Sequence, residues 1–129
     1  MLRAGLTIVA AALILAATPS LAQETGPTVV EVHLKNFTFT PSELHLRRGV
    51  PVILRLVDPS GSHSFAAPEL FAASTLDPAT VALIRDGKVE VPEEGVELHL
   101  TPNTSGAYAF HCTHLMHSAF GMKGTVIVG

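Results

Sequence analysis

Short runs in which apolar and other residues alternate, separated by glycine and proline, constrain the fold of this chain more than any other feature of its sequence. Val52, Leu54 and Leu56 occupy every second position of one run, and other residues stand between them. The same two-residue period returns over residues 96–101 and 107–112. Because successive side chains of a strand point to opposite faces, each run predicts a strand with one face in a core. The runs are typical of antiparallel strands and not of helices.

Four further runs extend this pattern along the chain. We expect strands at 29–35, 43–47, 88–91 and 124–128. Residues 68–84 break the alternation, and we expect a short, partly helical insertion there. About seven strands with such an insertion predict an all-β fold, a Greek-key β-sandwich.

The N-terminus carries the pattern of a signal peptide. Arg3 is followed by an unbroken apolar run over residues 6–17, and small residues stand at the two positions that signal peptidase reads before a cleavage after Ala22. The run is too short to span a bilayer as a helix. A membrane anchor retained in the mature protein is the alternative, but polar residues begin at once and no stop-transfer segment follows.

Export sets the expected organisation and location of the mature chain. We expect a periplasmic, monomeric protein without a membrane span after removal of the signal peptide. The formal net charge is −3, and no cluster of Lys and Arg exceeds the pair at 47–48, so partners should be proteins or ions and not nucleic acid. The predicted division is a signal peptide over residues 1–22, a flexible N-terminus over 23–27 and one domain over 28–129.

Cys112 is the single cysteine of this exported chain. In an oxidising compartment cysteines are normally paired or absent, so an unpaired thiol needs protection, which either burial or metal ligation supplies. The parity of the run at 107–112 directs Cys112 inward. From the cysteine alone, both explanations remain open.

Three sulfur and imidazole donors follow one another near the C-terminus. Cys112, His117 and Met122 have the spacing C-x4-H-x4-M. Sulfur with imidazole selects copper among the common metals, and two histidines and one cysteine with a long axial methionine form the type 1 electron-transfer site. His63, in a loop just after the predicted strand at 52–57, supplies the second histidine. We therefore predict one copper ion, Cu(I) or Cu(II), held by His63, Cys112, His117 and Met122. The alternative is a chance grouping of surface histidines around a buried cysteine.

Four segments carry a resemblance to a known family. The chain contains NFTFTP at 36–41, GVPV at 49–52, GAYAFHC at 106–112, and HSA followed by MKGT within 117–125. These segments resemble the first strands, the penultimate strand and the ligand loop of small exported cupredoxins, the family of azurin, plastocyanin and auracyanin. The likeness covers essentially the whole predicted domain. The C-x4-H-x4-M spacing is similar to auracyanin and to the type 1 site of multicopper oxidases, whereas azurins have one residue fewer before the methionine.

The resemblance implies a surface for redox partner proteins near His117. We expect the apolar residues Leu115, Met116, Ala119 and Phe120 to surround His117 there, where the edge of the ligand approaches solvent and the electron leaves. Simple packing of the loop is the alternative for each of these residues.

The resemblance also implies a hydrogen bond behind the ligands. An asparagine usually follows the first histidine in this family, and Ser64 stands there in this chain. We expect Ser64 to hydrogen-bond across to Thr113 and so to help fix the electronics of the thiolate.

Two functions fit these features, and an enzyme does not. The first is a one-electron carrier between redox proteins. The alternative is copper resistance, storage or delivery, motivated by the seven histidines and by His111, His114 and Met116, which are either ordinary half-exposed residues or ligands of a second, weaker copper site. We expect no enzymatic activity, because Thr113 stands where multicopper oxidases carry a further histidine ligand, and no His-x-His pair or catalytic triad is present.

Overall fold

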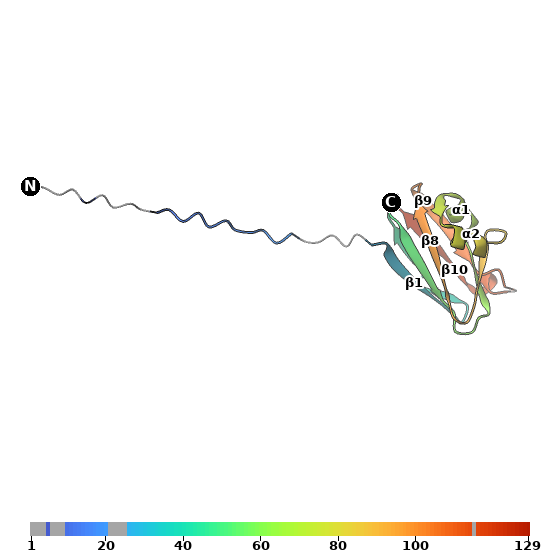
Figure 1. The fold of residues 1–129 in the computed structure, drawn as a ribbon. Coiled ribbons are helices and arrows are strands. Elements are labelled where there is room, and N and C mark those ends of the chain that lie inside the picture. Colours follow the sequence, from blue (N-terminus) through green and yellow to red (C-terminus); the bar gives the residue numbers. More distant parts are fainter. Residues whose placement is uncertain (1–4, 6–9, 21–25, 115) are drawn as a thin grey trace, which may run out of the picture.

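Two five-stranded sheets pack face to face as a β-sandwich in the computed structural model, which describes residues 5, 10–20, 26–114 and 116–129 (Figure 1). The first sheet has the order β2–β1–β4–β8–β6, with β1 at Thr28–Lys35, β2 at Thr38–Thr40, β4 at Val52–Val57, β6 at Ser74–Leu76 and β8 at Val96–Pro102. The second has the order β3–β10–β9–β5–β7, with β3 at Glu43–Leu46, β5 at His63–Ala66, β7 at Lys88–Val91, β9 at Gly106–His111 and β10 at Lys123–Val128. The predicted all-β sandwich is confirmed.

The direction of two strand pairs differs from the expectation. β1 runs parallel to β4, and β10 runs parallel to β3, whereas the other described pairs are antiparallel. The expectation of antiparallel strands is therefore wrong for these two pairs. Alternation in a sequence reports which face of a strand is buried and carries no information about the direction of the neighbouring strand.

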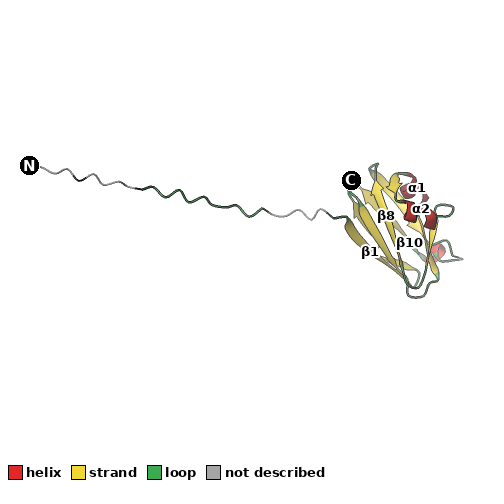
Figure 2. Ribbon diagram, viewed as in Figure 1, coloured by secondary structure: helices red, strands yellow, loops and turns green. Residues whose placement is uncertain are grey.

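The partly helical insertion is confirmed and contains a strand that was not expected. It consists of α1 at Pro68–Ala72, the strand β6 and α2 at Pro78–Leu83 (Figure 2). Leu70 and Phe71 of α1 are buried, so α1 is attached to the core. β6 is only three residues long and pairs with β8 at the edge of the first sheet.

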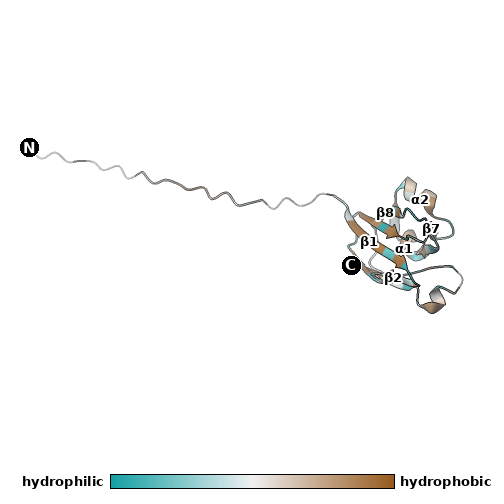
Figure 3. Ribbon diagram, turned by 90° about the horizontal axis from the view of Figure 1, so that it is seen from below, coloured by the Kyte–Doolittle hydropathy of each residue, from teal (hydrophilic) through white to brown (hydrophobic). Residues whose placement is uncertain are grey.

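Three phenylalanines form the centre of the core between the sheets. Phe39 of β2, Phe65 of β5 and Phe110 of β9 are buried, and the centroid of the Phe110 ring lies 4.9 Å from that of Phe39 and 5.0 Å from that of Phe65. Figure 3 shows hydrophobic and hydrophilic residues succeeding one another along strands such as β1 and β8, as the alternation predicts. Burial of each ring stabilises the fold by about 1.5–3 kcal/mol. Because β5 starts at His63 and β9 leads into Cys112, this core fixes the two strands that carry predicted ligands.

Residues 10–20, which precede β1, lie apart from the sandwich (Figure 1). Residues 10–20 are exposed and have no regular secondary structure. The predicted cleavage position after Ala22 lies outside the described residues, and the division of the chain at 22 and 27 stays a prediction. Within the described part of the chain, no helix has the length and apolar character needed to cross a membrane.

Candidate metal centre

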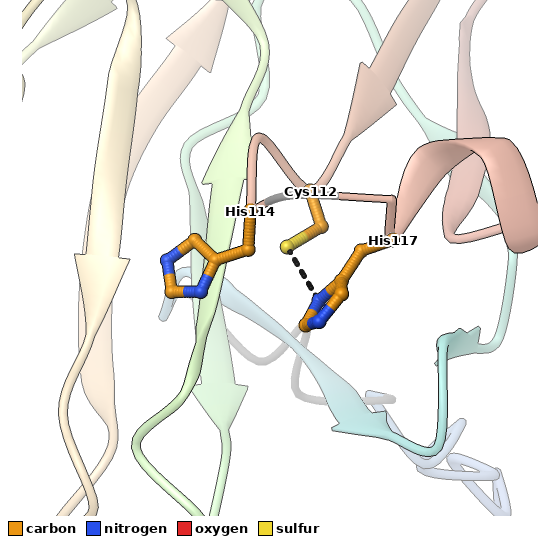
Figure 4. Close-up of side chains that lie close together, drawn as sticks. All are labelled: Cys112, His114 and His117. Carbon is orange, nitrogen blue, oxygen red and sulfur yellow. Dashed lines mark hydrogen bonds between the residues drawn. The ribbon is translucent and has the colours of Figure 1, made fainter.

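Cys112 directly follows β9 and lies at the centre of the candidate site. Its side chain is fully buried, as the parity of its run predicts. Its backbone N–H donates to the carbonyl oxygen of Met122 at 3.1 Å, which joins the two ends of the intervening loop. Its Sγ lies 3.4 Å from Nδ1 of His117, and Figure 4 shows the two side chains directed toward each other. Burial and an imidazole neighbour therefore occur together at this thiol.

The loop from Cys112 to Met122 is held by its own backbone hydrogen bonds. The N–H of His117 donates to the carbonyl of His114 at 3.1 Å, and the N–H of Met122 donates to the carbonyl of His117 at 3.0 Å. A 3-10 turn at Ser118–Phe120 fills the remaining length. Met122 is fully buried. Three of the four predicted ligands thus lie on one short loop whose backbone is fixed at several points.

His63 reaches the site from the other ligand-bearing strand. It is the first residue of β5, where it pairs with Val91 of β7. The expectation that His63 lies in a loop is therefore wrong, because it begins a strand. Its side chain is buried, and its ring centroid lies 5.1 Å from that of His117. Its backbone N–H donates to Oδ2 of Asp58 at 2.9 Å, and its Nδ1 lies 3.1 Å from the same oxygen.

Ser64 joins the two ligand-bearing segments. Its Oγ accepts the backbone N–H of Thr113 at 2.8 Å and lies 2.8 Å from Oγ1 of the same residue. The backbone N–H of Ser64 also donates to Sγ of Cys112 at 3.4 Å. The expected hydrogen bond between Ser64 and Thr113 is confirmed. Ser64 therefore ties the strand that begins with His63 to the segment that carries the Cys112 sulfur.

His114 lies closer to the thiol than the sequence indicated. In the described part of the chain, Cys112, His114 and His117 form the one group of cysteine, histidine and acidic side chains whose ligand atoms lie within 4.8 Å of one another. His63 is not in this group, although it contacts the ring of His117. The Nε2 of His114 lies 2.7 Å from Oε2 of Glu90, which directs this imidazole toward β7. The spacing C-x-H-x2-H was the available signal, but the loop backbone that brings these side chains together cannot be deduced from spacing.

His117 lies at the edge of an exposed apolar surface. The ring of Phe37 meets the ring of His117 edge to face, with centroids 4.8 Å apart, and lies 5.5 Å from the ring of Phe120. Phe37, Met116 and Phe120 are 42%, 55% and 65% exposed. We call these three residues the apolar collar. Phe120 and Met116 were expected there, Leu115 lies outside the described residues, and Phe37 was not expected, because it comes from the turn between β1 and β2.

The protonation of His117 suits a metal ligand. Partial burial lowers the pKa of His117 below its usual value, and the neighbouring imidazoles of His63 and His114 lower it further. A lowered pKa keeps the imidazole neutral near pH 7, and a metal binds the neutral form.

Copper is the metal that this donor set fits best. The site combines a buried thiol, imidazoles and a buried thioether residue, which are the soft and borderline ligands that copper takes in proteins. Cys112, His114 and His117 are grouped so that they could hold the ion together, His63 contacts the ring of His117, and Met122 is hydrogen-bonded through its backbone to Cys112 and His117.

Three of the remaining histidines are exposed and the fourth is half-buried. His33, His45 and His99 are exposed on strands, and each contacts the glutamate two residues before it, with N–O distances of 2.7, 2.7 and 3.5 Å. His111 is half-buried in β9, where it pairs with Lys123 of β10. None of these four belongs to the metal-binding group found among the described residues.

Known structures share this fold. Auracyanin B matches the chain with a TM-score of 0.59 at 22% identity, over 83% of this chain and 92% of its own. The blue copper protein auracyanin A from Chloroflexus aurantiacus matches with a TM-score of 0.54 at 22% identity, over 81% and 100%. The metal-binding domain of the Cu(I)-exporting P-type ATPase of Streptococcus pneumoniae, solved with Cu(I), matches with a TM-score of 0.56 at 17% identity, over 84% and 91%. No curated protein sequence matches the chain.

Residues 5–128 match the cupredoxin-like domain family, which is nearly the whole chain. The two-sheet sandwich and the copper-type site at one end of it agree with this match. The chain is a member of the cupredoxin family.

Proposed function

We propose that this cupredoxin is a periplasmic type 1 copper protein that carries one electron between redox proteins, with copper held by His63, Cys112, His117 and Met122. The observation that carries the proposal is the buried thiol of Cys112, 3.4 Å from Nδ1 of His117 and facing the N–H of Ser64. Copper, when bound, supplies the one-electron couple between Cu(II) and Cu(I).

The protein holds the proposed ligands rigidly and shields the sulfur residues from water. Cys112 and Met122 are fully buried, so water is excluded from both sulfur residues. Backbone hydrogen bonds tie Met122 to Cys112 and to His117, and the hydroxyl of Ser64 ties β5 to the loop. A ligand set that is held by paired backbone cannot relax far when the charge of the metal changes, which favours fast electron transfer.

The apolar collar suits transient docking of a redox partner. His117 touches Phe37 directly, and Phe37 and Phe120 expose rings to solvent beside it. A small apolar surface around a ligand edge permits a short electron path and a complex that separates quickly. We therefore place the exit of the electron at His117, in a protein that acts as a monomer.

Export is supported by the exposed apolar segment before the sandwich. Leu13, Ile14 and Leu15 are at least 86% exposed, which is unfavourable for a retained part of a mature protein. If residues 1–22 are cleaved off as a signal peptide, the mature protein no longer carries these exposed apolar side chains.

Titration of the protein with Cu(II), followed by voltammetry, tests the electron-carrier proposal. We expect saturation at one equivalent and a reversible one-electron wave. Binding of several equivalents, or an irreversible wave, would contradict the proposal.

Copper storage or delivery is the second candidate, and His114 is the observation that favours it. This imidazole joins Cys112 and His117 in one group, and Met116 beside it is 55% exposed, so copper could pass to ligands nearer the surface. One structural neighbour is the metal-binding domain of a Cu(I)-exporting ATPase. Transfer of bound Cu(I) to a competing chelator separates the two functions, because a carrier retains Cu(I) and a delivery protein releases it.

Matched alanine variants decide which histidine completes the site. We expect His63→Ala to abolish the thiolate-to-copper absorption band and His114→Ala to leave it in place. The opposite result would assign the ligand role to His114 and favour copper delivery.

A further inference from the structure

A surface pocket opens beside two of the predicted copper ligands. Its volume is about 460 Å³, and His63 and His117 form part of its wall. The rest of the wall comes from residues 34–37, at the turn between β1 and β2, and from the loop that follows β4. Cavities that hold small ligands have volumes of roughly 300–1,000 Å³. The pocket is therefore large enough for a small ligand or for a side chain of a docked protein.

The backbone on both sides of the pocket is fixed. Asn36 and Phe37 have φ values of 51° and 61°, and two successive residues with positive φ close a tight β-hairpin. On the other side, the hydroxyl of Ser60 donates to Oδ1 of Asp58 at 2.6 Å and lies 2.7 Å from the hydroxyl of Ser62. A pocket with fixed walls loses little conformational entropy when it is filled.

Lys35 gives the pocket a positive charge. It is exposed, it lines the pocket, and no acidic residue does so. Among the ion pairs of the described residues, none includes Lys35. Asp58 is completely buried, and its oxygens accept hydrogen bonds from Ser60 and from the backbone N–H of His63. In a chain with a formal net charge of −3, this positively charged wall is a local exception.

The pocket is continuous with the apolar collar. Phe37 lines the pocket and also packs on His117 and Phe120. A group that enters the pocket therefore lies at the edge of the surface on which a redox partner would rest. An acidic side chain fits this place, because its carboxylate can pair with Lys35 while its methylene groups lie against the ring of Phe37.

We propose, on the basis of the electron-carrier function proposed above, that this pocket receives an acidic side chain of the redox partner, whose carboxylate pairs with Lys35 while the partner covers the apolar collar. Lys35 then contributes to the choice of partner. A partner with a basic residue at this position would bring two positive charges together, which disfavours the complex.

Acetate, the group at the end of an acidic side chain, probes the pocket in the metal-free protein, and acetamide is its neutral control. At constant ionic strength, we expect acetate to shift the backbone amide NMR signals of Lys35, Asn36 and Ser62 until they saturate, and acetamide to leave them in place. An absence of saturable shifts, or equal shifts with acetamide, would overturn the proposal.

Two lysine variants assign the acetate binding to one charge. Lys35→Met removes the charge and keeps most of the side-chain length, and it should weaken acetate binding roughly threefold to fivefold, as expected for one exposed charge pair. Lys123→Met is the matched control, because Lys123 is also an exposed lysine but does not line the pocket. The control should bind acetate like the wild type. Equal binding by the two variants would overturn the proposal.

Electron transfer to the anionic complex of cobalt(III) with EDTA tests docking as distinct from capture of a free acid. The complex carries its carboxylates on a redox-active body, and it takes one electron from Cu(I) to become cobalt(II). Its rate constant with the Cu(I) protein should fall roughly threefold to fivefold in Lys35→Met and should stay near the wild-type value in Lys123→Met. The cationic tris(phenanthroline) complex of cobalt(III) should not be slowed in either variant. If acetate binds but Lys35→Met reacts with the EDTA complex at the wild-type rate, the pocket takes free carboxylates only, and the docking role is overturned.

The acetate titration needs no copper, so it separates this proposal from the electron-carrier function. If the copper-loaded wild type shows no type 1 signature, the electron-carrier function fails, and the docking role of the pocket fails with it. If the signature is present and acetate does not bind at Lys35, only the pocket proposal fails.

Discussion

The hydroxyl of Ser64 accepts the backbone N–H of Thr113 at 2.8 Å and so joins the strand that begins with His63 to the loop that begins with Cys112. These two segments are nearly 50 residues apart in sequence. The Ser64 side chain is completely buried, and its N–H faces the Cys112 sulfur. The contact therefore sets the distance between the two halves of the metal centre.

Ser64→Ala should weaken both the fold and the site. Loss of the hydroxyl leaves the Thr113 N–H without its acceptor, which costs about 1–2 kcal/mol of unfolding free energy. Urea unfolding of the metal-free protein measures this loss, and the energy of the thiolate-to-copper band in the loaded protein should shift as well. Ser105→Ala, at an exposed position outside any strand, is the control and should change neither. Equal behaviour of the two variants would show that the Ser64 contact is unimportant.

Phe120→Ser should slow electron exchange between molecules without unfolding the protein. Phe120 is 65% exposed and packs on Phe37, which in turn contacts His117. Removing this apolar area from a docking complex costs about 1.4 kcal/mol, which is roughly a tenfold decrease in the self-exchange rate constant. NMR line broadening in mixtures of oxidised and reduced protein measures that constant. Val81→Ser, at a 54% exposed apolar residue of α2, should have no effect, and a similar decrease there would argue against docking at the collar.

The sequence predicted those parts of the fold that depend on local period. Alternation placed Leu54, Leu98 and Phe110 in the core, and all three are fully buried. It missed β5, because all four residues of that strand are buried and no alternation exists there. It could not give the parallel direction of β1 and β4, since that depends on chain segments far apart in sequence.

The candidate site was predictable in its donors and not in its surroundings. Residue chemistry and spacing identified Cys112 and His117, which the structure places in contact. Phe37 contacts His117 but lies 80 residues before it, in a turn where Phe37 itself has a positive φ. No local sequence pattern links two residues so far apart. His114 lies beyond the end of β9, where strand parity no longer indicates the direction of a side chain.

Gly124→Ala should destabilise the sandwich close to the site. A Cβ at this position would collide with the ring of Phe110 and with the carbonyl oxygen of Ser42. Overpacking of this kind costs about 1–3 kcal/mol, and each kcal/mol lowers the Tm of a domain this size by about 4–8 °C. Thermal unfolding followed by circular dichroism measures the change. Gly26→Ala, where a Cβ meets open space, should leave the Tm unchanged. A wild-type Tm for Gly124→Ala would contradict this prediction, because it would mean that β9 and β10 move to accommodate the methyl group at no cost in stability.

The stability of the metal-free protein should fall at acid pH in part through Asp77. This residue caps α2, and its Oδ1 accepts the backbone N–H of Thr80 at 2.8 Å. Hydrogen bonds from Thr80 lower the pKa of Asp77 below its ordinary value of 3.8. Because the folded pKa is lower than the unfolded one, the ionised carboxylate stabilises the fold above pH 3.8, and this contribution disappears as the pH falls through the folded pKa.

Asp77→Asn isolates that contribution, because asparagine is also a good helix cap but does not ionise. The stability difference between wild type and Asp77→Asn should be largest near neutral pH and should shrink below pH 3.8. Urea unfolding at a series of pH values measures the difference. A difference that stays constant with pH would show that the charge of Asp77 does not contribute to the stability of the fold.

The visible absorption spectrum of the protein with one equivalent of Cu(II), recorded beside that of Cys112→Ser, tests the central claim of a type 1 copper site most directly. We predict an intense thiolate-to-copper band in the wild type, accompanied by a narrow copper hyperfine splitting in the EPR spectrum, and loss of both in a Cys112→Ser protein that keeps its β-sheet circular dichroism. A wild-type protein without this band, or a band that survives in Cys112→Ser, would contradict the claim.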